Sequence, residues 1–154
     1  MDPLLVEVDQ LLSRGDKESL ETVLDRILER FDCAVGTVHE LDRSDGLLHL
    51  RAHRGLPEVL LDRVSKIPIG KGMAGLAAQR REPVQVCNLQ TDDSGAARPG
   101  AKQTQMEGSI ALPMLCGDIL YGSLGVAKPV PYEFTPEETE TLLALASRIG
   151  ESFR

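Results

Sequence analysis

Aromatic residues are scarce in this sequence. It contains no Trp, two Tyr and three Phe among 154 residues, and none of the five lies between Asp32 and Leu120. Sites for purines, flavins, haem or bilins usually offer an aromatic ring on which the ligand stacks. A pocket built from the central part of the chain therefore suits a small or apolar ligand, or stays empty, and the sequence indicates no particular cofactor.

A long apolar run and an excess of basic residues are also missing. No run approaches the roughly 18 apolar residues that span a bilayer, and the Met-Asp-Pro start lacks the basic segment of a signal peptide. The net charge is −7, and Arg80–Arg81 is the only adjacent basic pair. We therefore expect neither a nucleic-acid nor a membrane partner. Three cysteines without paired spacing fit a reducing compartment, so the expected location is cytoplasmic.

The stretch from Ile67 to Cys87 organises the centre of the chain. Three glycines, Gly70, Gly72 and Gly75, let the backbone turn sharply before a short helix. The first N–H groups of such a helix lack intrahelical partners and carry the positive end of the helix dipole. They therefore favour an anion or a carbonyl oxygen as their neighbour.

The same glycines spell G-x-G-x-x-G, which is the fingerprint of dinucleotide-binding folds. That fingerprint opens a full crossover helix, and an acidic residue follows on the next strand. Here the helix has only about two turns before Pro83, and the following strand ends in Cys87 and Asn88. The context therefore argues against a Rossmann fold.

Two amphipathic helices begin the chain. Residues 3–12 and 16–31 each repeat apolar residues with the helical period, and Gly15 separates them. Together they offer more apolar surface than one small sheet face needs, which favours pairing with a second copy. Packing within one chain is the alternative. We divide the chain into an N-terminal helix, residues 1–15, as a candidate dimerisation element, and a main domain, residues 16–154.

Strands and short helices follow one another through the rest of the chain. Strands are expected at 34–41, 47–53, 84–87, 109–115 and 119–127, a short helix at 57–64, and a final helix after a capping box at 135–138. Apolar residues on both faces of the fourth strand predict a central, doubly covered strand. His49 and His53 share one strand face, but they would lie about 13 Å apart, so no metal site is expected.

Residues 88–108 have almost no hydrophobic periodicity and are rich in Gly, Ala, Gln, Asp and Thr. Long loops in compact domains are often lids or binding loops. The segment is therefore a candidate cover for a pocket, and a surface loop without a role is the alternative.

The segments Ile67–Gly75, Arg81–Val84, Ser109–Val126 and Phe134–Ala146 together resemble the GAF domain family, over about residues 17–153. The resemblance implies an α+β fold, in which a GAF-like antiparallel sheet carries terminal helices on one face. Short helices and a long loop cover the other face, and the loop closes over a pocket. Members of this family bind many different ligands or none, so the resemblance specifies the fold rather than the ligand.

Some GAF proteins are free methionine-(R)-sulfoxide reductases, in which a Gly-x-Gly-x-Cys-Gly segment supplies the catalytic cysteine. The matching position here is Ala74, whereas Cys87 and Cys116 lie elsewhere in the sequence. Because no thiol stands at the start of the helix, where its pKa would be lowered, we expect no enzyme activity. A reductase-like enzyme is the alternative.

The cyclic-nucleotide signature of the same family is matched only in part. It resembles Asn-Lys followed by Phe-x-x-x-Asp-Glu, whereas this chain has Ala127 before Lys128 and Thr139 after Glu138. Lys128 and Glu138 match the signature in type and are candidates for an ion pair worth about 0.5 kcal/mol. Covalent bilin attachment is disfavoured because the sequence has no Cys-His pair.

The sequence thus predicts a non-catalytic, small-molecule-sensing domain. A ligand under the loop would be coupled to a signalling partner or to a homodimer formed through the terminal helices. A small anion such as nitrate is a candidate ligand, and a ligand-free interaction module is the alternative. The expected ligand-binding residues are Gly72, Met73, Ala74, Gly75, Leu76, Val86, Asn88, Leu89, Ser109 and Ile110.

Overall fold

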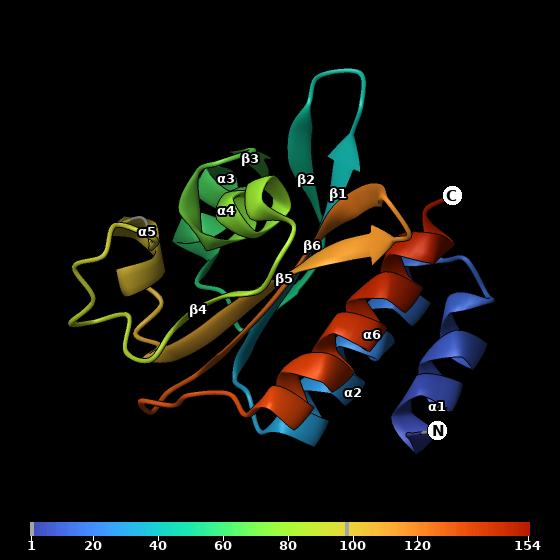
Figure 1. Cartoon of the computed structure of the whole chain (residues 1–154), viewed down its shortest axis with the longest axis horizontal. Helices are drawn as coiled ribbons and strands as arrows, with labels where there is room; N and C mark the ends of the chain where they lie inside the picture. The colour runs from blue at the N-terminus through green and yellow to red at the C-terminus, as the bar shows by residue number, and fades with distance from the viewer. Residues whose placement is uncertain (1, 98) are drawn as a thin grey trace.

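The computed structural model describes residues 2–97 and 99–154. Its centre is an antiparallel six-stranded sheet in the order β3-β2-β1-β6-β5-β4, with helices on both faces (Figure 1). The strands are β1 (Val35–Asp42), β2 (Leu47–Arg54), β3 (Lys66–Pro68), β4 (Val84–Val86), β5 (Gly108–Cys116) and β6 (Ile119–Lys128). The helices are α1 (Pro3–Leu12), α2 (Lys17–Phe31), η1 (Glu58–Leu60), α3 (Leu61–Val64), α4 (Gly72–Arg80), α5 (Pro99–Lys102) and α6 (Pro136–Ser152). The predicted α+β fold is confirmed.

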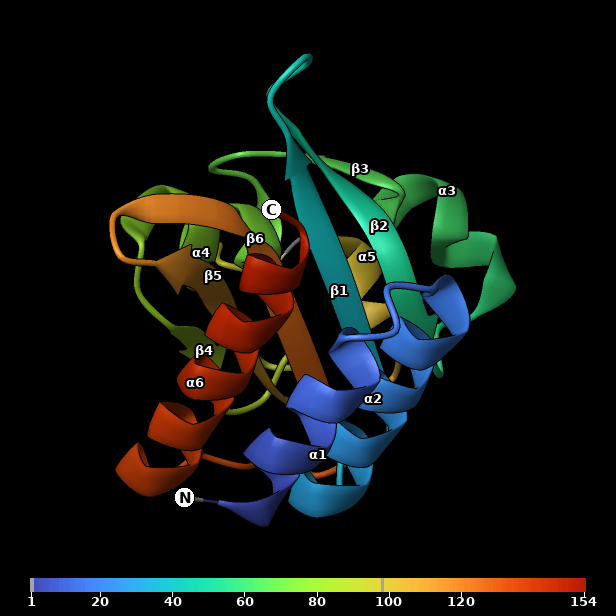
Figure 2. The same cartoon turned by 90° about the vertical axis from the view of Figure 1, so that its right-hand side faces the viewer.

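The helices α2 and α6 cover one face of the sheet, and α1 packs on their outer side (Figures 1 and 2). Their apolar faces form the main core together with inward side chains of the sheet. The largest fully buried members of this core are Leu24, Ile27, Ile110, Leu112, Met114, Leu124, Leu142, Leu145 and Ile149. Helix α6 begins at the predicted capping box, because the Glu138 N–H donates to the Thr135 hydroxyl and the Thr135 N–H donates to the Glu138 carboxylate. In the described part of the chain, no helix combines the length and apolar character that a membrane span needs.

Helix α1 lies against α2 and α6 (Figure 2). Leu4 and Val8 of α1 are buried in the main core, and an ion pair between Glu7 and Arg26, 2.8 Å apart, joins α1 to α2. Much of the apolar stripe of α1 is therefore covered within one chain. The division after residue 15 and the pairing with a second copy remain predictions.

Strand β1 connects the two layers. On the side of the terminal helices, a Cβ atom at Gly36 would lie only 2.8 Å from Leu24 Cδ1, so α2 packs directly on the backbone of β1. Val35, Thr37 and His39 face the opposite side of the sheet, as the period of a strand requires. A displacement of β1 toward one layer therefore changes its packing against the other layer.

Strand β5 does not have the central position that the sequence predicts for residues 109–115. It lies one place from the edge, beside the short edge strand β4, and β1 and β6 form the central pair. Helix α6 covers one face of β5 and α4 covers the other. Apolar residues on both faces reflect this coverage, which a strand next to an edge can have as well as a central one.

The helices η1, α3 and α4 and the segment 88–107 cover the second face of the sheet (Figure 1). The Leu89 N–H donates to Glu107 O at 2.7 Å and closes the base of the segment, and Gln90 Nε2 donates to Met106 O at 2.8 Å. The sequence predicts only loop here, but the structure adds the one-turn helix α5. The segment is therefore a folded cover whose two ends are hydrogen-bonded to each other.

Candidate ligand pocket

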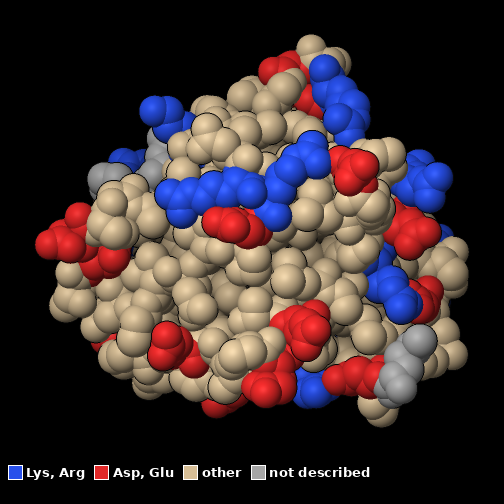
Figure 3. Space-filling view, viewed as in Figure 1, with Lys and Arg blue, Asp and Glu red and all other residues tan. Residues whose placement is uncertain are grey.

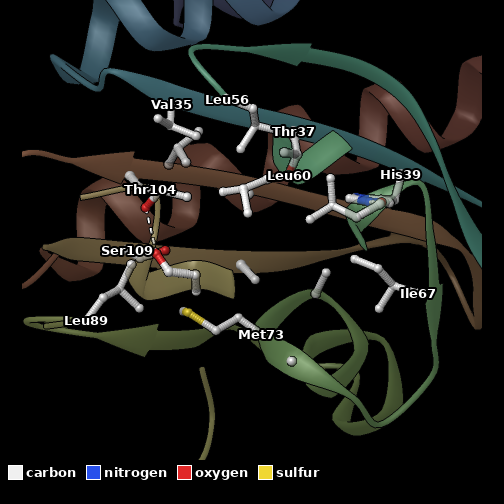
Figure 4. A pocket seen from close by; sticks show the side chains of 18 of the residues that line it. Val35, Thr37, His39, Leu56, Leu60, Ile67, Met73, Leu89, Thr104 and Ser109 are labelled. Atoms are coloured by element: carbon white, nitrogen blue, oxygen red, sulfur yellow. Dashed lines mark hydrogen bonds between the residues drawn. The ribbon is translucent and has the colours of Figure 1, made fainter. Parts of the chain in front are cut away.

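A cavity of about 520 Å³ lies between the sheet and the layer of short helices (Figure 4). Its floor consists of residues from β1, β6 and β5, and its walls come from the segment 56–67, from α4 and from the segment 88–107. The floor residues are Val35, Thr37, His39, Ser109, Ile110, Ala111, Gly125, Val126 and Ala127. The wall residues include Leu56, Leu60, Arg63, Val64, Ile67, Gly72, Met73, Ala74, Leu89, Ala101 and Thr104. The described lining contains no Phe, Tyr or Trp, in line with the scarcity of these residues in the sequence.

The structure brings six of the ten predicted binding residues to this cavity. They are Gly72, Met73, Ala74, Leu89, Ser109 and Ile110. The other four, Gly75, Leu76, Val86 and Asn88, are not among its lining residues. Leu76 packs beside Ala77 and Val84 instead. Asn88 uses its side-chain oxygen to accept a hydrogen bond from Gln90 N at 3.0 Å.

The start of α4 offers fewer free N–H groups than the sequence suggests. The Gly75 N–H donates to Lys71 O at 3.2 Å, which is the first backbone bond of the helix, so it is not available to a ligand. Gly75 also faces the preceding turn, since a Cβ there would lie 2.5 Å from Pro68 O. The N–H groups of Met73 and Ala74 precede this first bond, and no backbone partner for them occurs among the described residues.

Sequence reasoning missed the residues that β1 and the segment 56–67 contribute. Val35, Thr37 and His39 alternate along β1, and this period could have placed them together on one face of the sheet. The pattern does not say which face is hollow, because that depends on the helices packed above it. Leu60 and Ile67 come to the pocket only through the path of η1, α3 and β3.

His39 is the one buried polar side chain of the described lining. The geometry shows which of its ring nitrogens carries the proton. Its Nε2 lies 2.8 Å from Val64 O, and because a carbonyl only accepts hydrogen bonds, Nε2 carries the proton. Nδ1 is then an acceptor, and it has no hydrogen-bond partner among the described residues although the side chain is 1% exposed. Burial lowers the pKa of His39, with smaller contributions from its neighbours, so the ring is neutral at pH 7.

The three cysteines lie outside the described lining of the pocket. Burial raises the pKa of the Cys33 thiol to about 11. Cys116 Sγ donates to Ser147 O at 3.3 Å, on the side of α6, and Cys87 follows β4 at the surface. Ala74 stands at the pocket wall where the reductase resemblance has its cysteine.

The expected ion pair between Lys128 and Glu138 is wrong, since the described residues show none between these two side chains. Lys128 is buried, donates to Phe31 O at 2.6 Å and lies 4.2 Å from the ring centre of Tyr132. The Tyr132 hydroxyl donates to the Glu138 carboxylate at 2.6 Å. The two residues that match the nucleotide signature in type therefore connect β6, α2 and α6, on the opposite side from the pocket lining.

Charged side chains of both signs are interspersed on the face that Figure 3 shows, around a mainly uncharged centre. At the tip of the β1–β2 hairpin, Asp42, Asp45 and His49 bring their ligand atoms within 4.8 Å of one another. Asp42 also accepts from Ser44 N, and Asp45 accepts from Leu47 N, so both carboxylates shape the turn. The sequence reasoning considered His49 only together with His53 and missed this cluster.

A single antiparallel sheet between two helical layers, with a hollow on the side of the short helices, defines the class of fold. The family model described as GAF domain matches residues 14–153, and the chain therefore belongs to the GAF domain family. No curated protein sequence matches the chain.

Solved GAF structures share this fold at low sequence identity. The GAF domain of a phosphoenolpyruvate-protein phosphotransferase from Coxiella burnetii has a TM-score of 0.82 and 20% identity, covering 97% of this chain and 90% of that one. The free methionine-R-sulfoxide reductase from Neisseria meningitidis, solved with its substrate, has a TM-score of 0.77 and 18% identity, covering 97% and 86%. A protein described as a GAF sensor from Burkholderia vietnamiensis has a TM-score of 0.76 and 21% identity, and the match covers 97% of this chain and 90% of that one.

Proposed function

We propose that this GAF domain is a non-catalytic sensor that binds a small molecule in the 520 Å³ cavity and passes the binding event to its terminal helices. The cavity is the observation that supports the proposal most strongly. It has the size of a small-molecule site, it is mainly apolar, and a few polar groups converge on it. The similarity in fold to a protein described as a GAF sensor agrees with this proposal.

The route from the pocket to the helices runs through the strands of its floor. Thr37 faces the pocket, while its neighbour Gly36 touches Leu24 of α2. Ser109 and Ala111 of β5 face the pocket side, and the side chain of Ile110 between them packs in the core with α6. A ligand that shifts these strands by a fraction of an ångström would therefore change the packing of α2 and α6. That change would alter how these helices contact a signalling partner or a second copy in a homodimer.

The segment 88–107 is the proposed lid. Leu89, Ala101 and Thr104 line the pocket from this segment, and Arg63 Nη1 of α3 donates to Gln103 Oε1 at 3.4 Å across the mouth. A single long hydrogen bond between exposed side chains is weak, so opening at this point costs little. The paired base of the segment would stay closed while its tip moves.

A reductase function is the second candidate, because a free methionine-R-sulfoxide reductase shares the fold. Reduction of a sulfoxide by this route needs a thiolate beside the bound substrate. Ala74 stands at the pocket wall, and Cys33 and Cys116 lie on the side of the terminal helices. The arrangement of residues therefore favours the sensor. Thiol-dependent reduction of free methionine sulfoxide above the background rate would reverse this preference.

The proposal is tested by thermal unfolding in the presence of nitrate, nucleotides, amino acids, small carboxylates and small alcohols. A ligand at 100 times its dissociation constant stabilises the protein by about 2.7 kcal/mol, or roughly 5–10 °C. Ser109→Phe fills the floor of the pocket and should abolish the shift. Ser44→Phe places the same side chain on the exposed hairpin tip and should keep the shift. Flat curves for all compounds would favour a ligand-free interaction module, and a shift that survives Ser109→Phe would mean that the ligand binds outside this cavity.

A further inference from the structure

We infer that the ligand of this pocket is a compact, uncharged and mainly apolar molecule that donates a hydrogen bond to His39 Nδ1. The inference rests on the proposed function and narrows it to a class of ligand. It also replaces the small anion, which the sequence suggested, with a neutral molecule as the favoured occupant.

The wall of the pocket is mainly aliphatic. Leu60 and Ile67 are buried aliphatic residues of the wall, and Met73 projects into the cavity from the start of α4 (Figure 4). An apolar ligand gains about 25 cal/mol for each Å² of its surface that such walls remove from water. Transfer of an ion into these surroundings would be unfavourable unless a fixed opposite charge compensated for it.

Fixed charge in the described lining lies at the mouth of the pocket. Arg63 is the one lysine, arginine or carboxylate among the described lining residues, and it is an exposed side chain at the mouth. Its guanidinium already contacts Gln103 across that mouth. A charge on a ligand in the interior would therefore meet no opposite full charge there, only the dipoles of the two N–H groups at the start of α4 and of the Thr37 and Ser109 hydroxyls. This lining suits a neutral molecule better than nitrate.

His39 adds a specific polar requirement to this lining. The ring projects into the pocket from β1 (Figure 4), and the hydrogen bond from Nε2 to Val64 O fixes both its orientation and its tautomer. Nδ1 is consequently an acceptor that neither the described residues nor bulk water satisfies. Buried polar atoms without a partner are rare in native proteins, because the loss of hydration is not compensated. A hydroxyl or N–H group of a molecule in the pocket would supply the missing donor.

Two hydroxyl groups complete a polar strip on the otherwise apolar floor. Thr37 and Ser109 lie on either side of β6, opposite Gly125 and Ala127 respectively. Neither hydroxyl has a hydrogen bond within the part of the chain that the structure describes, and both can donate or accept. The two hydroxyls can therefore pair with either a donor or an acceptor on the ligand, whereas His39 Nδ1 can pair only with a donor. His39 therefore sets the chemical requirement.

The test compares three probes with the same ring, cyclohexanol, cyclohexanone and cyclohexanecarboxylate, by titration of the protein in NMR. Cyclohexanol has a donor, cyclohexanone has only an acceptor, and the third is an anion. The wild-type protein should bind cyclohexanol about tenfold more tightly than either of the others, which corresponds to about 1.4 kcal/mol. His39→Phe should reduce that preference to less than about twofold. His53→Phe, on the neighbouring strand and outside the described lining, should retain it.

A second readout does not depend on the folding of a variant. The 15N chemical shift of His39 Nδ1 in the wild-type protein should move when cyclohexanol binds and stay in place when cyclohexanone binds. Equal affinities for these two probes, or an unmoved Nδ1 signal with cyclohexanol bound, would overturn the role of His39 and leave the sensor proposal standing. Preference for the carboxylate would overturn the claim of a neutral ligand. Absence of binding by all three probes would overturn the inference, and the sensor proposal would fail with it only if the thermal screen were flat as well.

Discussion

The stability of this domain should fall between pH 7.5 and pH 5.5 because of His39. Burial lowers the pKa of this imidazole in the folded protein and outweighs the hydrogen bond to Val64 O, which raises it, while repulsion from His49 on the adjacent strand lowers it slightly further. Arg63, at the pocket mouth, is a further positive charge near this side of the sheet. The unfolded chain titrates near pH 6.5. Below that pH His39 binds a proton in the unfolded state but stays neutral in the folded state, so acid favours unfolding.

The size of this loss of stability follows from the difference between the pKa of His39 in the folded and in the unfolded state. One pH unit below the unfolded pKa, a histidine that stays neutral in the folded protein lowers the free energy of unfolding by up to about 1.4 kcal/mol. The carboxylates with lowered pKa values act in a more acidic range, since their stabilisation is lost only as the pH falls below about 4. The window between pH 5.5 and 7.5 therefore reports mainly on buried imidazole.

The assay is urea unfolding followed by circular dichroism at pH 5.5, 6.5 and 7.5. The wild-type protein should lose about 1 kcal/mol more than His39→Phe over this range, because phenylalanine cannot bind the proton. His53→Phe removes a different imidazole and should keep the loss, since His39 is still present. An equal loss in the wild type and in His39→Phe would refute the description of His39 as a neutral, buried side chain.

Three further substitutions test the packing that holds the pocket. Lys128→Met removes the hydrogen bond to Phe31 O and the contact with an aromatic ring, and should lower the free energy of unfolding by about 2 kcal/mol. Thr135→Ala removes the N-cap of α6 and should cost about 1 kcal/mol in the same measurement. Gly36→Val forces a side chain against Leu24 and should cost about 1–3 kcal/mol, while binding of a pocket ligand is weakened as β1 moves.

Each of these has a clear contrary result. Unchanged stability in Lys128→Met would mean that the buried ammonium gains no more than its desolvation costs. No change in Thr135→Ala would show that water replaces the hydroxyl at the helix start. Ligand affinity that stays the same in a destabilised Gly36→Val would contradict the route from the pocket to α2 through β1.

Local patterns predicted most of the fold. The capping box at Thr135 and Glu138 fixes the start of α6, Gly70 and Gly72 adopt the positive φ of the turn into α4, and Gly75 lets the helix approach that turn closely. Such features depend on neighbours in the sequence, so the sequence reveals them. The place of β5 beside the edge of the sheet depends on which strands pair across long distances, and its apolar pattern does not encode that choice.

Only the part of the pocket formed by α4, β5 and Leu89 could be predicted from the sequence. Met73, Ala74, Ser109 and Ile110 were found because they belong to segments that resemble other GAF domains. His39 was missed because a histidine inside a strand has no local signature. Its role comes from the contact with Val64, which lies 25 residues further along the chain. The assignment of Lys128 to an ion pair failed for the same reason, since its true acceptor, Phe31 O, lies 97 residues away.

The claim that the hollow between the sheet and α4 is a binding site is tested most directly by methyl NMR during a titration with cyclohexanol. Leu60, Ile67 and Met73 line the cavity, whereas Leu142 and Ile149 belong to the core on the opposite side of the sheet. The account predicts saturable shifts of the first three methyl signals, smaller shifts of the other two, and no response in Ser109→Phe. Shifts confined to surface residues, or equal shifts in the wild type and in Ser109→Phe, would contradict it.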